Sequence, residues 1–212
     1  MYQDVFYRRH LPHIHPEGHP LFITFNLANS IPLDIWLELK QQREQELQKT
    51  APEQHYLIQK KFFGKYDEWL DRAEYGNRWL ALANIAQIVA DELHRMDGER
   101  YHLLAYCIMP NHIHMLIKSL VTEAAKHHGK SRNYPVTETL RLLKGRTARA
   151  CNLELKRSGK FWQHESYDHY ARNDEELGRI VAYIINNPVK AGLAKEWAEW
   201  KFTYLHPGLG EW

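Results

Sequence analysis

The sequence has few cysteines and no long apolar run, and each of these absences narrows the class of protein. Its two cysteines, Cys107 and Cys151, are too few for a disulfide framework and lie in apolar contexts, so buried thiols in a reducing compartment are expected. No apolar stretch approaches the roughly 18 residues that span a bilayer. The first residues lack a basic segment followed by an apolar run, so no secretory signal is visible. These features predict a cytoplasmic protein.

The composition is that of an ordinary globular protein, with 44% hydrophobic and 25% charged residues in 212 positions. A chain of this length fits one elaborated domain. We therefore expect residues 1–212 to form a single domain. A charged, helix-favouring region at about 33–73, broken at Thr50-Ala51-Pro52, predicts an inserted pair of helices within it.

Charge is unevenly distributed along the chain. Residues 33–100 hold ten Lys and Arg against thirteen Asp and Glu, whereas residues 124–160 hold ten against two. A basic segment of this kind, with histidines and a tyrosine among its charges, suits a polyphosphate backbone. The alternative is a solvated helix face whose balancing acids lie elsewhere in the fold.

Hydrophobic periodicity and turn residues predict the order of the secondary structure elements. Asn84 and Asn173 are predicted to cap helices, and Pro188 is predicted to end the last one. Without the insertion the order is strand, helix, strand, strand, helix, strand, helix, which predicts an α+β fold with a ferredoxin-like antiparallel sheet and one appended helix. Strands are expected at 21–27, 101–109, 112–118 and 161–171, and helices at 33–48, 53–73, 84–96, 136–155 and 173–187.

Two histidines lie two residues apart in the predicted strand at 112–118. Because side chains alternate along a strand, His112 and His114 share one face and Ile113 shares the other face with Met115. Two imidazoles in this arrangement can bind one divalent metal ion. They can equally be histidines on a half-exposed sheet face without a ligand. His164 could join such a site or orient a ligand.

The last predicted helix carries a tyrosine and an asparagine four residues apart. Tyr183 and Asn187 therefore lie on one edge of this helix, beside its buried stripe. A phenol is a poor nucleophile toward phosphate unless a cation or a base assists it, and a metal held by two histidines and the Asn187 carbonyl could do so. The alternative is an aromatic residue at the boundary of the core.

Five segments in this order carry a resemblance to a known family. Residues 105–117 (AYCIMPNHIHMLI) resemble the His-hydrophobic-His signature of the HUH single-tyrosine transposases. Residues 183–193 (YIINNPVKAGL) are similar to the tyrosine helix of one branch, the REP-associated tyrosine transposases. Further agreement lies in residues 12–16 (PHIHP), 75–80 (YGNRWL) and 161–168 (FWQHESYD).

The resemblance implies the HUH endonuclease fold and a role for each matched position. His112, His114 and Asn187 correspond to ligands of a divalent metal ion, Mg²⁺ or Mn²⁺, and Tyr183 corresponds to the nucleophile. The family cuts single-stranded DNA at palindromic REP hairpins through a 5′-phosphotyrosine, and the freed 3′-OH can later rejoin strands. No cluster of Asp or Glu is expected near the ligands, which fits Mn²⁺ at least as well as Mg²⁺.

The resemblance also implies DNA contacts and a transposase-like role in DNA recombination. It favours a monomer over a dimer. Backbone clamps are expected from the loop at 126–132 and the basic helix, and His164 is expected to contact unpaired bases. The expected DNA-binding residues are Lys126, Lys130, Arg132, Arg141, Lys144, Arg146, Arg149 and His164.

Two other functions stay open from the sequence. One is a catalytically silent protein that binds DNA hairpins through the same fold and basic surface. The other is a metal-dependent RNA-processing enzyme. The presence of Tyr183, His112, His114 and Asn187 together argues against a silent protein.

Overall fold

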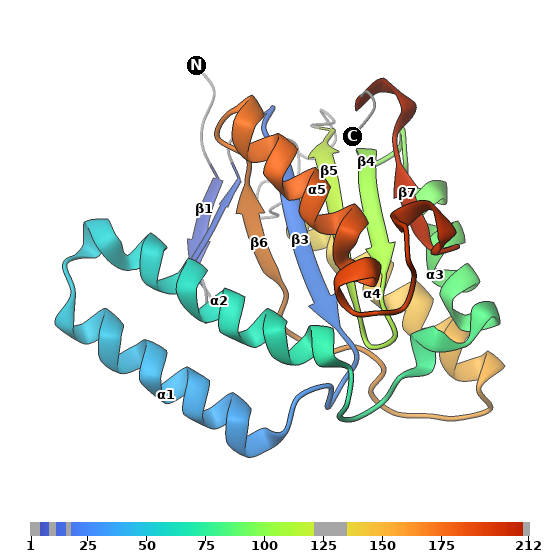
Figure 1. Cartoon of the computed structure of the whole chain (residues 1–212), viewed down its shortest axis with the longest axis horizontal. Coiled ribbons are helices and arrows are strands. Elements are labelled where there is room, and N and C mark those ends of the chain that lie inside the picture. The colour runs from blue at the N-terminus through green and yellow to red at the C-terminus, as the bar shows by residue number, and fades with distance from the viewer. Residues whose placement is uncertain (1–4, 9–11, 16–17, 121–134, 210–212) are drawn as a thin grey trace, which may run out of the picture.

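The structure is a computed structural model that describes residues 5–8, 12–15, 18–120 and 135–209. Its centre is an antiparallel sheet of five strands in the order β6-β3-β5-β4-β7 (Figure 1). The strands are β3 (Pro20–Asn26), β4 (Tyr101–Ile108), β5 (His112–Ser119), β6 (Tyr167–Tyr170) and β7 (Thr203–Leu205). The first four have the strand order of a ferredoxin-like fold, so the predicted α+β class is confirmed.

A separate two-stranded ribbon precedes the sheet. It consists of β1 (Val5–Arg8) and β2 (Pro12–His15), which pair antiparallel, and Figure 1 shows it on the side of the sheet where β6 lies. Residues 12–15 of the PHIHP segment thus form extended backbone.

Helices cover both faces of the sheet. One face packs against α3 (Ala83–Arg95) and α4 (Pro135–Glu154) and buries Ile113, Met115 and Ile117 of β5. The other face packs against α5 (Asp174–Lys190) and buries Phe22 and Leu116. The alternation of β5 therefore directs His112 and His114 toward α5.

The inserted region forms two helices, α1 (Leu33–Lys49) and α2 (His55–Arg72). In Figure 1 α2 crosses in front of β3, on the same side of the sheet as α5, and α1 lies outside it. The side chains of α1 are all at least partly exposed, whereas α2 buries Ile58, Phe62, Asp67 and Leu70. A buried aspartate in a surface helix is unusual, and it marks the point where the insertion meets the sheet.

Asn84 and Pro188 do not act as the sequence predicts. The helix α3 begins at Ala83, and the Asn84 side chain donates instead to Glu154 Oε1 at 2.7 Å. Pro188 lies inside α5, which continues to Lys190. Proline in a last turn breaks only one main-chain hydrogen bond, and the burial of Asn187 and Pro188 against the sheet favours the helix.

Asn173 acts as the sequence predicts, and two differences from the predicted elements lie on the C-terminal side. Asn173 caps α5 by accepting a hydrogen bond from the Glu176 main-chain nitrogen at 2.8 Å. Only residues 167–170 of the predicted strand at 161–171 are strand, and β7 was not predicted.

Both cysteines are buried, and burial raises the pKa of each thiol to about 12. None of the described helices is long and apolar enough to cross a membrane.

Candidate active site between the sheet and two helices

The two histidines of β5 converge through their outer ring nitrogens. Both side chains are fully buried, and the Nε2 atoms of His112 and His114 lie 2.9 Å apart. Each inner nitrogen already has a partner: His112 Nδ1 lies 2.7 Å from Asn111 Oδ1, and His114 Nδ1 lies 2.7 Å from Thr24 Oγ1. Because an amide oxygen only accepts, His112 carries its proton on Nδ1 and its Nε2 lone pair is free to bind a cation.

Burial keeps both imidazoles neutral. Burial lowers the pKa of His112 to about 4, although the carboxylate of Asp71 acts in the opposite direction. Burial, with the nearby His112, lowers the pKa of His114 well below its ordinary value. A metal ion needs the neutral form of histidine, so the site presents its ring nitrogens in the form that can bind one.

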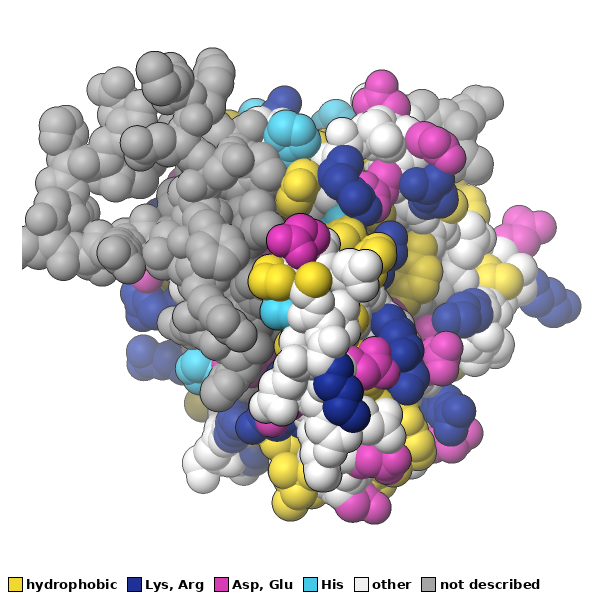
Figure 2. Space-filling model, turned by 90° about the vertical axis from the view of Figure 1, so that its left-hand side faces the viewer, with side chains coloured by type: hydrophobic (Ala, Val, Ile, Leu, Met, Phe, Trp, Pro, Cys, Tyr) yellow, Lys and Arg dark blue, Asp and Glu magenta, His cyan; other side chains and the backbone are white. Residues whose placement is uncertain are grey.

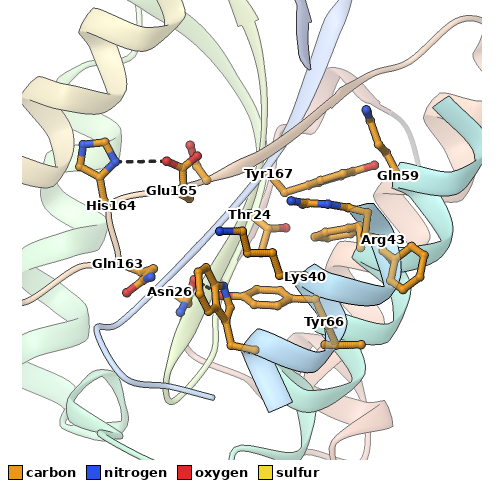
Figure 3. A pocket seen from close by; sticks show the side chains of 15 residues that line it. Thr24, Asn26, Lys40, Arg43, Gln59, Tyr66, Gln163, His164, Glu165 and Tyr167 are labelled. Atoms are coloured by element: carbon orange, nitrogen blue, oxygen red, sulfur yellow. Dashed lines mark hydrogen bonds and ion pairs between the residues drawn. The ribbon is translucent and has the colours of Figure 1, made fainter. Parts of the chain in front are cut away.

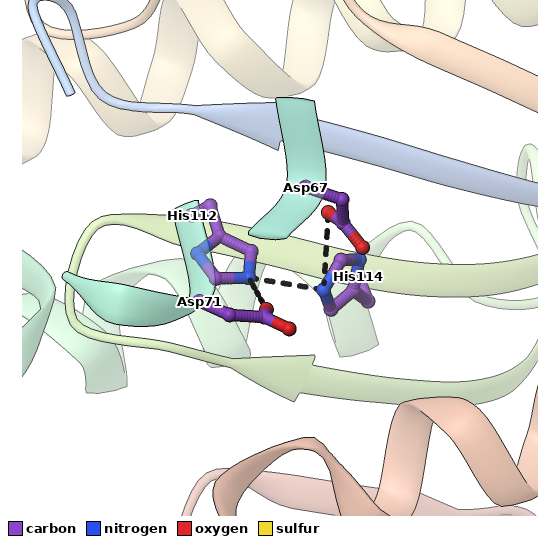
Figure 4. Close-up of side chains that lie close together, drawn as sticks. All are labelled: Asp67, Asp71, His112 and His114. Carbon is purple, nitrogen blue, oxygen red and sulfur yellow. Dashed lines mark hydrogen bonds and ion pairs between the residues drawn. The ribbon is translucent and has the colours of Figure 1, made fainter. Parts of the chain in front are cut away.

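Two aspartates of α2 complete a cluster that the sequence did not predict (Figure 4). One ligand atom from each of Asp67, Asp71, His112 and His114 lies within 4.8 Å of all the others. Asp71 Oδ1 is 3.6 Å from His112 Nε2, and Asp67 Oδ1 is 3.8 Å from His114 Nε2. The expectation of a site without clustered carboxylates is therefore wrong.

Tyr183 and Asn187 reach the same cluster from α5. The Tyr183 hydroxyl donates a hydrogen bond to Asp67 Oδ2. The Asn187 amide nitrogen is 3.1 Å from Asp71 Oδ1 and 3.3 Å from His114 Nε2. The spacing of four residues along one helix thus brings a phenol and an amide to the histidine pair.

One cation balances the two carboxylates. Lys190 Nζ lies 2.8 Å from Asp71 Oδ2, and the pair spans α5 and α2. Burial and the neighbouring negative charge of Asp71 raise the pKa of Asp67 well above its ordinary value. The raised pKa makes the ionised Asp67 carboxylate a stronger base than an ordinary aspartate, and its Oδ2 already accepts the hydrogen bond from the Tyr183 hydroxyl.

Two buried oxygens in the cluster lack a hydrogen-bond partner. They are Asp67 Oδ1 and Asn187 Oδ1. A buried oxygen without a hydrogen-bond partner lowers the free energy of unfolding. Rotation of the Asn187 amide by half a turn would place its oxygen where its nitrogen now faces His114. Neutral imidazoles, paired carboxylates and unsatisfied oxygens together fit a divalent cation such as Mg²⁺ or Mn²⁺.

The expected DNA-binding residues that the structure describes are not part of this cluster. His164 has an exposed side chain 3.3 Å from Glu165 and does not join the candidate ligands His112, His114, Asp67 and Asp71. On α4, which covers the opposite face of the sheet, Arg141 pairs with Glu138 and Arg146 pairs with Glu92. Arg149 is exposed. Lys144 donates to the main-chain oxygens of residues 164 and 165. Lys126, Lys130 and Arg132 lie outside the described residues.

Sequence reasoning missed Asp67 and Asp71 because they lie in the region at 33–73, which contains none of the motifs that carry the family resemblance. Their spacing of four residues places both carboxylates on one face of α2, and this pattern was available in the sequence. Surface helices carry such pairs commonly. Only the packing of α2 against β5 and α5 gives this pair a role.

Comparison with known proteins places the chain in a family. The family model described as "Transposase IS200 like" matches residues 83–187, which include both histidines, Tyr183 and Asn187. A protein of Haemophilus influenzae assigned as a REP-associated tyrosine transposase is 28% identical over 111 residues. The REP-associated tyrosine transposase of Escherichia coli K12 is 33% identical over 66 residues.

These matches cover part of each protein. The first spans 50% of this chain and 60% of the Haemophilus protein, and the second spans 31% of this chain and 37% of the E. coli protein. The fold agrees over a greater length with a solved structure of a REP-associated tyrosine transposase bound to a REP hairpin. That likeness has a TM-score of 0.56 at 19% identity and covers 97% of this chain and 87% of the other. The chain therefore belongs, over residues 83–187, to the IS200-like transposase family, and it is similar in sequence and in fold to the REP-associated tyrosine transposases.

Proposed function

We propose that the protein is a metal-dependent endonuclease and strand transferase for single-stranded DNA that carries palindromic, REP-like hairpins. The observation that carries this proposal is the convergence of Tyr183 and Asn187 on the Nε2 atoms of His112 and His114. The DNA partner is proposed from the solved relative, whose structure holds a REP hairpin.

The side chains of the cluster have separate tasks in this reaction. His112, His114 and Asn187 would hold the cation, with Asp71 beside them. When bound, a divalent cation withdraws charge from the scissile phosphate and makes it more electrophilic. Lys190 holds Asp71 in place and adds a positive charge at the edge of the site.

The Tyr183 oxygen forms the new bond in the proposed step. Its hydroxyl proton passes to Asp67, which already accepts its hydrogen bond. The phenolic oxygen then attacks phosphorus, the bond from phosphorus to the 3′ oxygen breaks, and that oxygen takes up a proton from solvent. The products are a 5′-phosphotyrosine and a free 3′-OH, and the reverse attack by a 3′-OH rejoins strands.

Basic residues along α4 and the loop before it are proposed as backbone clamps. Arg141 and Lys144 line a hollow of about 460 Å³ together with His164. Arg146 and Arg149 of α4 would add positive charge, and so would Lys126, Lys130 and Arg132, which lie outside the described residues. We also propose that residues 1–212 act as one domain and as a monomer, because the cluster is complete within one chain.

The proposed function is tested by cleavage of single-stranded stem-loop DNA in the presence of Mn²⁺, followed on denaturing gels. Tyr183→Phe is expected to abolish both cleavage and the covalent protein–DNA adduct, because the variant lacks the attacking oxygen. Tyr75→Phe removes a hydroxyl from an exposed tyrosine and serves as the control. Hairpin binding without cleavage by the parent protein would indicate a catalytically silent hairpin-binding protein. Preferential cutting of ribose-containing hairpins would indicate an RNA-processing enzyme.

A further inference from the structure

The inner nitrogens of the two histidines face different chemical groups. His112 Nδ1 lies 2.7 Å from the side-chain amide oxygen of Asn111. His114 Nδ1 lies 2.7 Å from the hydroxyl oxygen of Thr24. An amide donates and accepts through separate atoms, whereas a hydroxyl oxygen can either donate or accept. The two histidines therefore differ in how firmly their neighbours fix the position of the ring proton.

The orientation of the Asn111 amide is fixed by the inserted helix α2. Its Nδ2 donates to the main-chain oxygen of Leu70 at 3.1 Å. Because a carbonyl oxygen only accepts, the amide nitrogen has to face Leu70 and the amide oxygen has to face His112. The main-chain oxygen of Asn111 in turn accepts from Leu27 N at 2.8 Å and from Ser30 Oγ at 3.2 Å. His112 is thus held with its proton on Nδ1.

The outer nitrogens of the pair need a proton or a cation between them. Their Nε2 atoms lie 2.9 Å apart (Figure 4), and two lone pairs facing each other at this distance repel. A neutral imidazole carries one proton, and that of His112 is on Nδ1, so before a cation binds His114 Nε2 has to donate to His112 Nε2. The unpaired Asp67 Oδ1, 3.8 Å from His114 Nε2, favours a proton there. The Asn187 amide nitrogen is 3.3 Å from the same atom and closer to Asp71 Oδ1, at 3.1 Å.

Thr24 can serve His114 with the ring proton on either nitrogen. It lies directly opposite His114 in the pairing of β3 with β5, and its side chain is buried. Within the described residues, the contact with His114 Nδ1 is the only hydrogen bond of its hydroxyl. When His114 carries its proton on Nε2, the hydroxyl donates to Nδ1. When the proton is on Nδ1, the same oxygen accepts it.

A cavity next to Thr24 gives the hydroxyl hydrogen somewhere to turn. Figure 3 shows Thr24 in the lining of this cavity of about 370 Å³, which lies between the inserted helices and the sheet. Asn26 and Gln163 add polar groups to the same lining. A polar cavity of this size can hold water, which accepts the hydrogen once Thr24 no longer donates to His114.

The charge on the outside of the insertion favours neither arrangement. Figure 2 shows Lys and Arg interspersed with Asp and Glu on the face that carries the turn between α1 and α2. Lys61 of α2, for example, pairs with Glu46 of α1 at 2.7 Å. Mixed exposed charges are largely screened, so the groups in direct contact with the imidazoles decide where the proton lies.

We propose that Asn111 and Thr24 are positioning residues of the metal site with different tasks. Asn111 keeps His112 in the tautomer with its proton on Nδ1, and Thr24 lets His114 change tautomer when a divalent cation binds. In this change the N–H bond at His114 Nε2 breaks and its proton goes to solvent, while Nδ1 takes up a proton from solvent, so no net proton is released. Thr24 turns from donor to acceptor. The proposal rests on the metal site of the proposed function.

The experiment reads the tautomers directly, by long-range ¹H–¹⁵N correlation spectra of the full-length protein labelled with ¹⁵N-histidine. The probe is Zn²⁺, which binds imidazole nitrogen and, unlike Mn²⁺, is diamagnetic and does not broaden the signals. Without Zn²⁺, His112 is expected to carry its proton on Nδ1 and His114 on Nε2. With Zn²⁺, both are expected to carry it on Nδ1. Asn111→Ala is expected to give His112 signals of both tautomers before Zn²⁺ is added.

The role of Thr24 is also measured as Zn²⁺ affinity by calorimetry. Thr24→Val keeps the shape of the side chain but removes the acceptor for His114 Nδ1, whose N–H becomes a stronger donor when the ring binds a cation. A loss of about 10–100-fold in affinity is expected. Thr24→Ser is expected to restore most of it, because the hydroxyl is present again. Thr139→Val, the same change at a buried threonine of α4, is the matched control and is expected to keep the affinity of the parent protein.

Three results would overturn the proposal. A proton on His114 Nδ1 before Zn²⁺ is added would show that no tautomer change takes place. A Thr24→Val variant with the affinity of the parent protein would show that Thr24 does not position the ligand. Both results leave the proposed cleavage function unaffected. If Zn²⁺ changes the signals of neither histidine, the pair does not bind metal, and the metal dependence of the proposed function fails as well.

Discussion

Glu176 connects the inserted helices to the sheet, and its replacement by glutamine tests this packing. Its side chain is 6% exposed, and its carboxylate accepts hydrogen bonds from His169 Nε2 at 3.0 Å and from the main-chain nitrogen and Nε of Arg172 at 3.1 and 3.0 Å. Arg172 in turn donates to the hydroxyl of Tyr56 on α2 at 3.1 Å. The network therefore holds β6, the start of α5 and α2 together.

The effect of this network on stability follows from the pKa of Glu176. Burial by itself raises this pKa, but the hydrogen bonds from Arg172 and His169 outweigh burial and lower it from 4.5 to about 2. Because the folded-state pKa lies below the unfolded one, the ionised carboxylate stabilises the fold above about pH 4.5. This stabilisation is lost as the pH falls toward 2. The difference corresponds to about 3 kcal/mol.

Glu176→Gln is therefore expected to lower the free energy of unfolding by about 2–3 kcal/mol at neutral pH, and by progressively less below pH 4.5. The assay is urea denaturation of parent and variant, followed by tryptophan fluorescence at neutral pH and at about pH 3. Comparing the two proteins at each pH removes the contribution of other carboxylates.

The control for this prediction is Glu175→Gln. Its side chain is 79% exposed and, within the described part of the chain, pairs only with Arg179 along the helix surface, so a change within about 0.5 kcal/mol is expected. A Glu176→Gln variant as stable as the parent at neutral pH, or a difference that does not shrink in acid, would show that the ionised carboxylate does not stabilise the fold through this network.

Three further predictions concern the metal and the backbone. Asp71→Asn is expected to weaken Mn²⁺ binding about 10–100-fold in calorimetric titrations. The control is Glu68→Gln at an exposed position of the same helix, which should leave the Mn²⁺ affinity unchanged. Equal affinities of the parent protein and Asp71→Asn would show that Asp71 does not contribute to metal binding. Gly76→Ala should lower the melting temperature by roughly 5–10 °C. The added Cβ would lie 1.9 Å from the Asn29 main-chain oxygen, and the backbone φ of +75° is strained for alanine. An unchanged melting temperature would contradict this close approach. Gly64→Ala should instead stabilise the protein by about 0.5–1 kcal/mol in urea denaturation, because alanine favours a helix over glycine and nothing lies within 4 Å of the added Cβ. A loss of stability would show that the added methyl group makes an unfavourable contact.

Local sequence rules explain the parts of the fold that were predicted correctly. Successive side chains of a strand such as β5 point to opposite faces of the sheet. The two-residue spacing of His112 and His114 was therefore enough to predict that they share a face. The spacing of Tyr183 and Asn187 follows from the helical repeat in the same way. Asn173 caps α5 because a short polar side chain satisfies a free main-chain nitrogen without help from the rest of the fold.

Predictions failed where contacts between distant segments outweigh local preference. Pro188 disfavours a helix locally, but its burial extends α5 by two residues beyond it. Asn84 can cap a helix, but its side chain instead bonds to Glu154, 70 residues away in the chain. Such competition between local and tertiary bonding cannot be evaluated from spacing along the chain alone.

Spacing along the chain was enough to predict the histidine pair, the tyrosine helix and the ferredoxin-like order of elements, because each depends on a repeat of two or about four residues. The position of Asp67 and Asp71 beside the histidines, and the cavity next to them, became evident only from the folded chain. The physical reason is that α2 approaches β5 and α5 from an insertion. Its distance from them is set by packing, which no local repeat encodes.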